Sequence, residues 1–189
     1  MKKLIIALAA VALGLSAQAA AVNWTTSTAL YTGNASDTFG GTVYLVDASS
    51  ANGGITQQAL LTAFLGGTLT IGNYDVASAG TSAGKITATL IDPIKKSDGT
   101  TNYGDGSVNF YMVAIDGDNI FISDTKAVTL STIGSAKAAF ALKAQSTAAA
   151  SLSTTFASGG WYAKSVPEPT SGLLMLVGLG ALALRRRRA

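Results

Sequence analysis

The alternation of apolar and polar positions divides this chain of 189 residues into three parts. Two apolar runs without charged residues, 4–15 and 172–184, lie near the ends. Between them, apolar residues alternate with Thr, Ser, Asp and Lys at the period of two that is typical of half-buried strands. The pattern predicts one β-rich domain over residues 20–165, preceded by a segment 1–19 and followed by a tail 166–189.

The middle part carries a series of short runs that favour strands, and one hairpin signal. The hairpin signal is the turn sequence over residues 116–119, because an Asp-Gly pair between two apolar runs favours a tight turn. The expected strands cover residues 41–48, 68–71, 74–76, 85–91, 108–115, 120–123, 127–130 and 160–164. Short strands separated by such turns are typical of a β-sandwich.

One segment has the helical period instead. Thr56 is a suitable N-cap, an apolar stripe follows it, and Gly66 ends the segment. The stripe consists of Leu60, Leu61, Phe64 and Leu65. Residues 136–144 fit either a helix or a strand. Residues 146–155 are rich in Ser, Thr and Ala, and we expect them to form a surface connection. We therefore expect a mostly β, single sandwich-like domain with one short helix, flanked by an N-terminal signal helix and a C-terminal transmembrane helix.

The first apolar run has the composition of a secretory signal. Lys2 and Lys3 precede it, its length is below that of an ordinary membrane span, and Ala17 and Ala19 form the small-x-small cleavage pattern. We expect Sec-type export machinery to transport the chain and signal peptidase to cut it between Ala19 and Ala20.

The tail has three physically distinct parts in a fixed order. The first is a proline tether, in which each proline fixes φ and lacks an N–H donor, so that a helix is disfavoured. The tether consists of Val166, Pro167, Glu168 and Pro169. The apolar run consists of Gly172, Leu173, Leu174, Met175, Leu176, Val177, Gly178, Leu179, Gly180, Ala181, Leu182, Ala183 and Leu184. The basic cluster that follows, Arg185, Arg186, Arg187 and Arg188, is a stop signal that stays on the cytoplasmic side.

This tail resembles the PEP-CTERM sorting domain of bacterial exported proteins. The resemblance rests on the proline tether, the apolar run and the arginine cluster, and it covers only the last 24 residues, 166–189. It implies that an exosortase recognises the tail while the tail is transiently in the membrane, and cuts it near the Pro-Glu-Pro motif. It also implies delivery to the cell surface or the extracellular matrix, in association with exopolysaccharide.

The charge of the chain lies mainly in its two ends. The whole sequence has a formal net charge of +3, but residues 20–165 hold seven lysines against nine aspartates, a net charge of −2. This balance excludes the electrostatic footprint of nucleic-acid binding. The chain has no cysteine and no histidine, which removes thiol chemistry and the usual Ser-His-Asp mechanism.

Two spacings and one carboxylate pair are candidates for catalysis. Residues 82–85 and 123–126 have the Ser-x-x-Lys spacing of a Ser-Lys nucleophile. Each lies in a turn before an expected strand rather than at a helix start, where the spacing brings the two side chains together. Asp116 and Asp118 lie in the expected hairpin turn, where carboxylates accept local backbone bonds. We interpret these residues as structural and expect no enzymatic activity.

Two further sets are candidates for binding. Asp98, Asn102 and Asp105 place oxygen atoms among glycines, which suits Ca²⁺, although the spacing fits no EF-hand. The aromatic residues that could stack on sugars are Trp24, Tyr31, Trp161 and Tyr162. We interpret the first set as an ordinary loop and the second as core cover. The sequence thus predicts a non-catalytic surface or matrix protein without a cofactor, with a carbohydrate- or calcium-binding surface module as the alternative.

Overall fold

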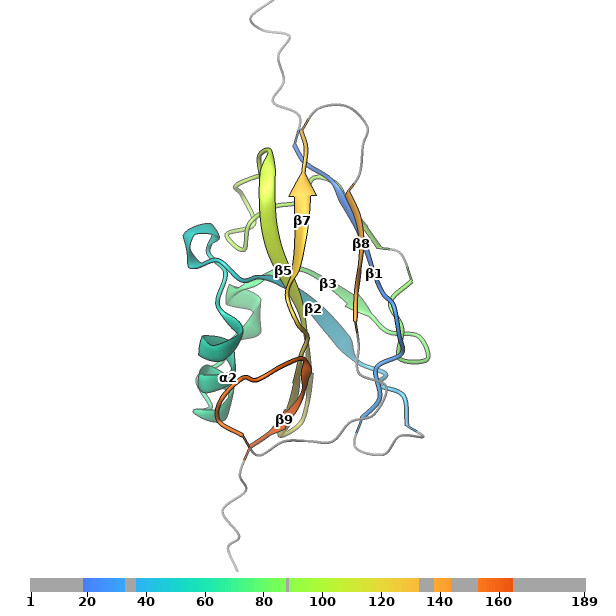
Figure 1. The fold of residues 1–189 in the computed structure, drawn as a ribbon, viewed down its shortest axis with the longest axis vertical. Coiled ribbons are helices and arrows are strands. Elements are labelled where there is room, and N and C mark those ends of the chain that lie inside the picture. Colours follow the sequence, from blue (N-terminus) through green and yellow to red (C-terminus); the bar gives the residue numbers. More distant parts are fainter. Residues whose placement is uncertain (1–18, 33–36, 88, 133–137, 144–152, 165–189) are drawn as a thin grey trace, which may run out of the picture.

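The computed structural model describes residues 19–32, 37–87, 89–132, 138–143 and 153–164, which form two β-sheets and one α-helix (Figure 1). The larger sheet has the strand order β3-β2-β5-β6-β9, with β7 paired to β5, and the smaller has the order β4-β1-β8. The strands are β1 (Val22–Thr26), β2 (Thr42–Asp47), β3 (Asp75–Gly80), β4 (Thr89–Ile91), β5 (Gly106–Asp116), β6 (Asn119–Ile122), β7 (Lys126–Leu130), β8 (Ala138–Leu142) and β9 (Gly160–Ala163). The mostly β class with one helix is confirmed.

The long strand β5 is the centre of the larger sheet. One of its edges pairs with β2, and the other pairs first with β6 and then with β7. The register joins Val113 to Ile122 in β6 and Phe110 to Lys126 in β7, so that three residues, 123–125, lie opposite two of β5. This extra residue is a β-bulge. It shifts by one position which residues of β7 face each side of the sheet.

Hydrogen bonds of one serine hold the bulge, and the bulge decides which side chains of β7 enter the core. The Oγ of Ser123 accepts the N–H of Met112 at 2.9 Å, and the N–H of Ser123 donates to the carbonyl of Met112 at 2.9 Å. Because side chains alternate between the faces of a sheet, the one-residue shift turns Val128 and Leu130 toward the core that also contains Phe121.

Both faces of the larger sheet are buried. One face shares a core cluster with the smaller sheet, in which Trp24 of β1 packs with Phe110 of β5 and Phe140 of β8. The other face packs against the helix α2 (Gln57–Leu65) through Tyr111 and its neighbours. Figure 1 shows α2 on the side of the larger sheet that faces away from β1 and β8. The two sheets thus enclose one core and the helix closes a second, while the assignment to a sandwich stays a prediction.

The helix follows its sequence signals. Thr56 is the N-cap and its Oγ1 accepts the N–H of Ala59 at 3.3 Å. Gly66 is the C-cap, and the buried residues of the helix belong to the predicted stripe. They are Leu60, Leu61 and Phe64. The predicted helix is therefore confirmed.

Three strand predictions need correction: one was wrong, and two were wrong in part. Residues 68–71 form no strand, because the amides of Thr68 and Leu69 donate to the carbonyl of Ala63 at the end of α2, and the chain then forms the 3₁₀ helix η2 (Ile71–Asn73). A second 3₁₀ helix, η1 (Ser50–Asn52), precedes α2. Strand β3 begins at Asp75, inside the expected run 74–76, and continues to Gly80.

Only the end of the run 85–91 is a strand. Lys85 turns back and exchanges two backbone hydrogen bonds with Ser82, at 2.9 and 3.0 Å. The two residues between them, Ala83 and Gly84, have φ values of 49° and 71°, which are the positive values that a type I′ turn requires. The other runs form β2, β5, β6, β7 and β9 close to the predicted bounds.

Two strands of the smaller sheet were not assigned from the sequence. Strand β1 was not predicted, although Val22, Trp24 and Thr26 alternate with less buried residues. Strand β8 settles the open segment in favour of alternation, with Phe140 and Leu142 buried. β1 and β8 are parallel partners that lie more than a hundred residues apart, so no local signal connects them.

Candidate functional site

The last strand fixes the chain immediately before the predicted tail. Strand β9 pairs with β6 up to Ala163, which lies opposite Asn119. The next residue, Lys164, donates its N–H to the carbonyl of Asp118 at 2.9 Å. The tether residues 166–169, the apolar run 172–184 and the arginines 185–188 lie outside the described residues, as does the predicted signal helix. Within the described part of the chain, no helix is long and apolar enough to span a membrane.

Strand β9 joins the core through two neighbouring aromatic residues. Trp161 packs on the side of the smaller sheet, where its ring lies 5.7 Å from that of Phe121 and 6.0 Å from that of Phe39 between centroids. Its indole N–H donates to the carbonyl of Tyr31 at 2.7 Å. Tyr162 packs on the helix side, and its hydroxyl donates to the carbonyl of Ser158 at 2.7 Å. The strand therefore contributes to both cores.

Lys164 and the β5–β6 turn lie together at the end of β9. The Nζ of Lys164 lies 4.7 Å from the centroid of the Phe64 ring, close enough for a cation–π interaction. The turn consists of Gly117 and Asp118, and Gly117 has a φ of 57°, as the tight hairpin requires. The predicted hairpin is confirmed. We call this turn, together with Lys164, the exit end of the domain.

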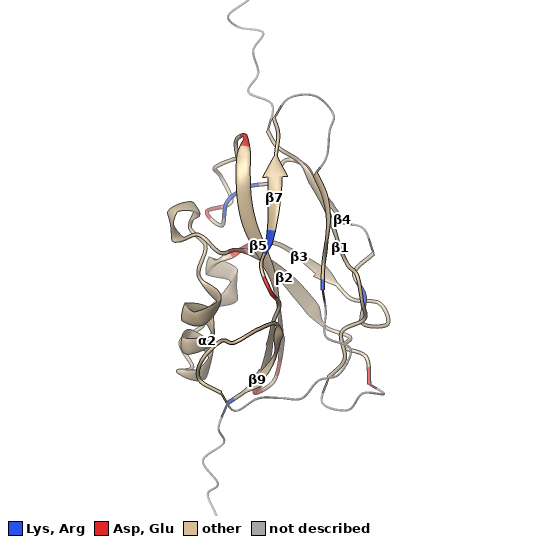
Figure 2. Ribbon diagram, in the orientation of Figure 1, with Lys and Arg blue, Asp and Glu red and all other residues tan. Residues whose placement is uncertain are grey.

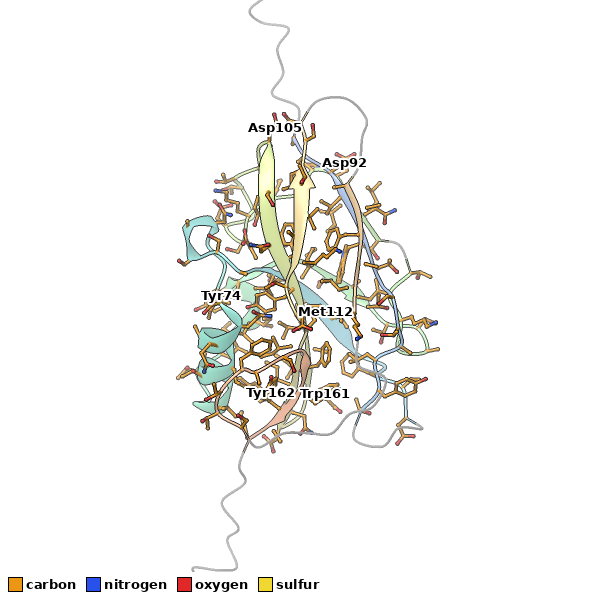
Figure 3. All side chains as sticks on the ribbon, viewed as in Figure 1. Tyr74, Asp92, Asp105, Met112, Trp161 and Tyr162 are labelled. Carbon is orange, nitrogen blue, oxygen red and sulfur yellow. The ribbon has the colours of Figure 1, made fainter. Side chains whose placement is uncertain are left out.

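The first described residues lie at the opposite end. Ala20 is fully buried in the core beneath the smaller sheet, and its carbonyl accepts the N–H of Ile94 at 2.8 Å. Figure 3 shows Asp92, two residues before Ile94, far along the long axis from Trp161 and Tyr162. Strand β5, with its 11 residues, runs between these ends, which corresponds to about 35 Å at about 3.3 Å per residue. Ala17 lies outside the described residues, and Ala19 is half-buried.

The Ser-x-x-Lys spacings do not form nucleophile pairs. In residues 82–85 the serine and lysine are the two ends of the type I′ turn and both are exposed. In residues 123–126 the serine is buried, and its Oγ already accepts from Met112 and donates to the carbonyl of Asp124 at 2.9 Å. Both arrangements are accounted for by turn and bulge geometry.

The candidate calcium ligands have separate local partners. The Oδ1 of Asp98 accepts the N–H groups of Thr100 and Thr101 at 2.8 and 2.7 Å, and hydrogen bonds from the side chain and amide of Thr101 hold the pKa of Asp98 well below its usual range. Asp105 accepts from the amide and the hydroxyl of Thr132, which lower its pKa. Asn102 pairs through its backbone with Lys95.

These bonds direct the carboxylates to the backbone of their own loops. Within the residues that the structure describes, no group of three or more Asp or Glu side chains is arranged to hold a metal ion. Figure 2 shows the acidic positions distributed over several loops and turns. The calcium alternative therefore gains no support from the geometry.

The aromatic candidates are core residues. Trp24, Trp161 and Tyr162 have at most 4% of their surface exposed, and Tyr31 is half-buried. A ring that stacks on a sugar must expose a face, so the suggestion that these rings form a sugar-binding platform was wrong for the three buried ones. Their interpretation as core cover is confirmed.

One buried polar group was not found from the sequence. Asp47, at the end of β2, is fully buried and accepts from the amide of Ser49, the side-chain amide of Asn52 and the hydroxyl of Tyr103, each at 2.8 Å. Burial, and then the bond to Asp47, raise the pKa of Tyr103. All its donors are supplied by the fold, so we assign Asp47 to holding the loop after β2. Its partner Tyr103 is 56 residues away, which leaves no local sequence signal.

Tyr111 also lies near the carboxylate of Asp47, and its pKa is changed by burial and by that charge. Its hydroxyl donates to the carbonyl of Ile55 at 2.7 Å, and burial, followed by the negative charge of Asp47, raises its pKa. The tyrosine thus ties β5 to the chain that enters α2. The loop after β2, its glycine Gly54 and the helix start form one hydrogen-bonded unit; a Cβ on Gly54 would lie 2.0 Å from the carbonyl oxygen of Asp47.

Comparison with known proteins adds one finding for the tail. No curated protein and no solved structure matches the chain. Residues 165–188 match the PEP-CTERM protein-sorting motif, and this match begins directly after Lys164, the last residue that the structure fixes to the sheet. The motif implies an exported protein that an exosortase processes at the membrane. The chain thus carries a PEP-CTERM sorting tail attached without a spacer to a two-sheet β domain.

Proposed function

We propose that this protein is a non-catalytic surface or matrix protein, delivered as a folded β domain by an exosortase that removes its tail. The observation that carries the proposal is the match of residues 165–188 to the sorting motif, directly after β9. The domain is the delivered part, and the tail is an address that is lost on delivery.

The physical properties of the tail support removal rather than permanent anchoring. Its apolar run of 13 residues, 172–184, rises about 20 Å as a helix, whereas the hydrocarbon core of a bilayer is about 30 Å thick. The arginines 185–188 remain on the cytoplasmic side and stop transfer. The proline tether is disfavoured in a helix, and we propose that the enzyme reads it at the outer surface.

The absence of catalysis is proposed from the residue types. The chain has no histidine and no cysteine, and its one glutamate, Glu168, lies in the tail. The serine of the Ser-x-x-Lys spacing at position 123 already accepts a hydrogen bond from the amide of Met112 and donates one to the carbonyl of Asp124. An association with exopolysaccharide is part of the proposal and rests on the resemblance of the tail alone.

The test replaces both prolines of the tether. The variant Pro167→Ala, Pro169→Ala is produced in the native host and compared with Thr170→Ala, which leaves the motif intact. We expect the double variant to accumulate in the membrane fraction with its tail, while the Thr170→Ala protein leaves that fraction as the unaltered protein does. If the double variant loses its tail at the normal rate, the tether is not what the enzyme reads and the proposal is wrong.

A further inference from the structure

We propose that the tail is cut from the domain after the domain has folded, and that the exit end, made of the β5–β6 turn and Lys164, lies against the membrane enzyme during the cut. This inference rests on the proposed function and specifies the state of the substrate and its contact surface. In the cut, one peptide bond of the tail breaks, water or a surface amine takes the acyl group, and the released piece gains an α-amino group.

Folding fixes the end of the described chain through Lys164. The ladder between β9 and β6 extends to Ala163, and the amide of Lys164 is bonded to the carbonyl of Asp118. The strand cannot leave the sheet without exposing Trp161 and Tyr162, which are 2% and 4% exposed. Residues 160–164 are therefore held in the sheet and are not available to the cutting enzyme in the folded protein.

The motif lies a short distance along the chain from Lys164. Three residues lead from Lys164 to Pro167, and a fully extended chain covers at most about 10 Å over three residues. If the broken bond lies inside the tether 166–169, an enzyme that holds two residues on each side of that bond reaches close to Lys164 and touches the domain. The part of the domain that it meets is the exit end, where Gly117 and Asp118 are exposed and Lys164 lies over Phe64.

The other processed end contrasts with this arrangement. The predicted signal cut lies between Ala19 and Ala20, and Ala20 is fully buried and bonded to Ile94. Two residues later the chain enters β1, the central strand of the smaller sheet, which pairs with β4 and with β8. A peptidase cannot hold this bond once β1 is in place. The fold thus places the signal cut before folding, whereas the sorting motif begins after the end of β9, so that its cut does not require β9 to leave the sheet.

The order is tested by pulse-chase labelling in the producing cells with a brief protease challenge at each time point. We expect the intermediate without signal but with tail to become protease-resistant first, and the tail to be lost from that resistant pool. Loss of the tail while the chain is still protease-sensitive would overturn the inference and leave the proposed function standing. If the tail is never lost, both this inference and the proposed function are wrong.

The contact is tested by spacing. A six-residue Gly-Ser insertion between Lys164 and Ser165 adds up to about 20 Å of reach. Because it separates the enzyme from the exit end, we expect the tail to be lost at least threefold faster. The matched control places the same insertion between Gly104 and Asp105, at the far end of the domain in Figure 3, and we expect an unchanged rate there. An unchanged rate for the first insertion would show that the enzyme does not meet the domain and would overturn the contact. A slower rate would overturn the expected crowding, because it would mean that the contact assists the cut.

Discussion

Replacement of Trp161 by alanine tests whether the last strand holds the domain together. The indole is 2% exposed, lies between the rings of Phe39 and Phe121, and donates to the carbonyl of Tyr31 at 2.7 Å. Truncating a buried Trp to Ala costs about 3–5 kcal/mol, and removing the indole N–H accounts for about 1 kcal/mol of that. Since domains of this size are stable by only about 5–15 kcal/mol, the loss is a large share of the total.

The assay is urea unfolding of the domain from Ala20 to Lys164, followed by circular dichroism and tryptophan fluorescence. With a slope of about 2 kcal/mol per molar urea, we expect the midpoint of Trp161→Ala to fall by about 2 M. Trp161→Phe keeps most of the volume and loses the hydrogen bond, so its free energy of unfolding should fall by about 1–2 kcal/mol. Leu90→Ala is the control: Leu90 is 49% exposed, and a change within about 0.5 kcal/mol is expected. A midpoint of Trp161→Ala within 0.3 M of the unaltered domain, about the effect of the control, would refute the assignment of β9 as a core strand.

Three further predictions follow from the same contacts. A chain that ends at Lys164 should melt at the same temperature as one that keeps the tail, whereas a chain that ends at Gly159 lacks β9 and should not fold, as calorimetry would show. Ser123→Ala leaves the buried N–H of Met112 without its acceptor, so the free energy of unfolding should fall by about 1–3 kcal/mol in urea titrations. The lowered pKa of Asp98 means that its contribution to stability is present above its unfolded pKa of about 3.9 and is lost as the pH falls through the lower folded value. A ¹³C NMR titration of the folded domain should therefore find this carboxyl below 3.9, and a value at or above 3.9 would contradict the turn geometry.

The parts of the fold that the sequence predicted depend on local interactions. The helix α2 forms where Thr56 caps it and Gly66 ends it, and the β5–β6 hairpin turns at Gly117, because each signal lies within a few residues of its effect. The run 68–71 failed for a related reason: the amide of Thr68 caps the preceding helix instead of joining a ladder.

The parts that were missed depend on distant partners. Strand β1 has its partners β4 and β8 in distant parts of the chain, and the bulge at Ser123 is defined by the register of β6 and β7 with β5. Asp47 is structural because Tyr103 reaches it from another loop. None of these contacts has a signature in the neighbouring sequence.

The candidate functional features also separate into those that the local sequence predicts and those that depend on the fold. A sorting tail is read by export and processing enzymes as a linear signal, so the order tether, apolar run and arginines was sufficient to predict it. The role of the domain depends on its surface, and there the sugar-stacking suggestion failed because Trp24 and Trp161 are needed for the core.

The intact mass of the protein recovered from outside the producing cells tests the central claim most directly. We expect a chain that begins at Ala20 and ends within or shortly after the tether, between Val166 and Ser171, with β9 complete. A recovered chain that still carries the arginines 185–188 would contradict the claim that this tail is a removable address.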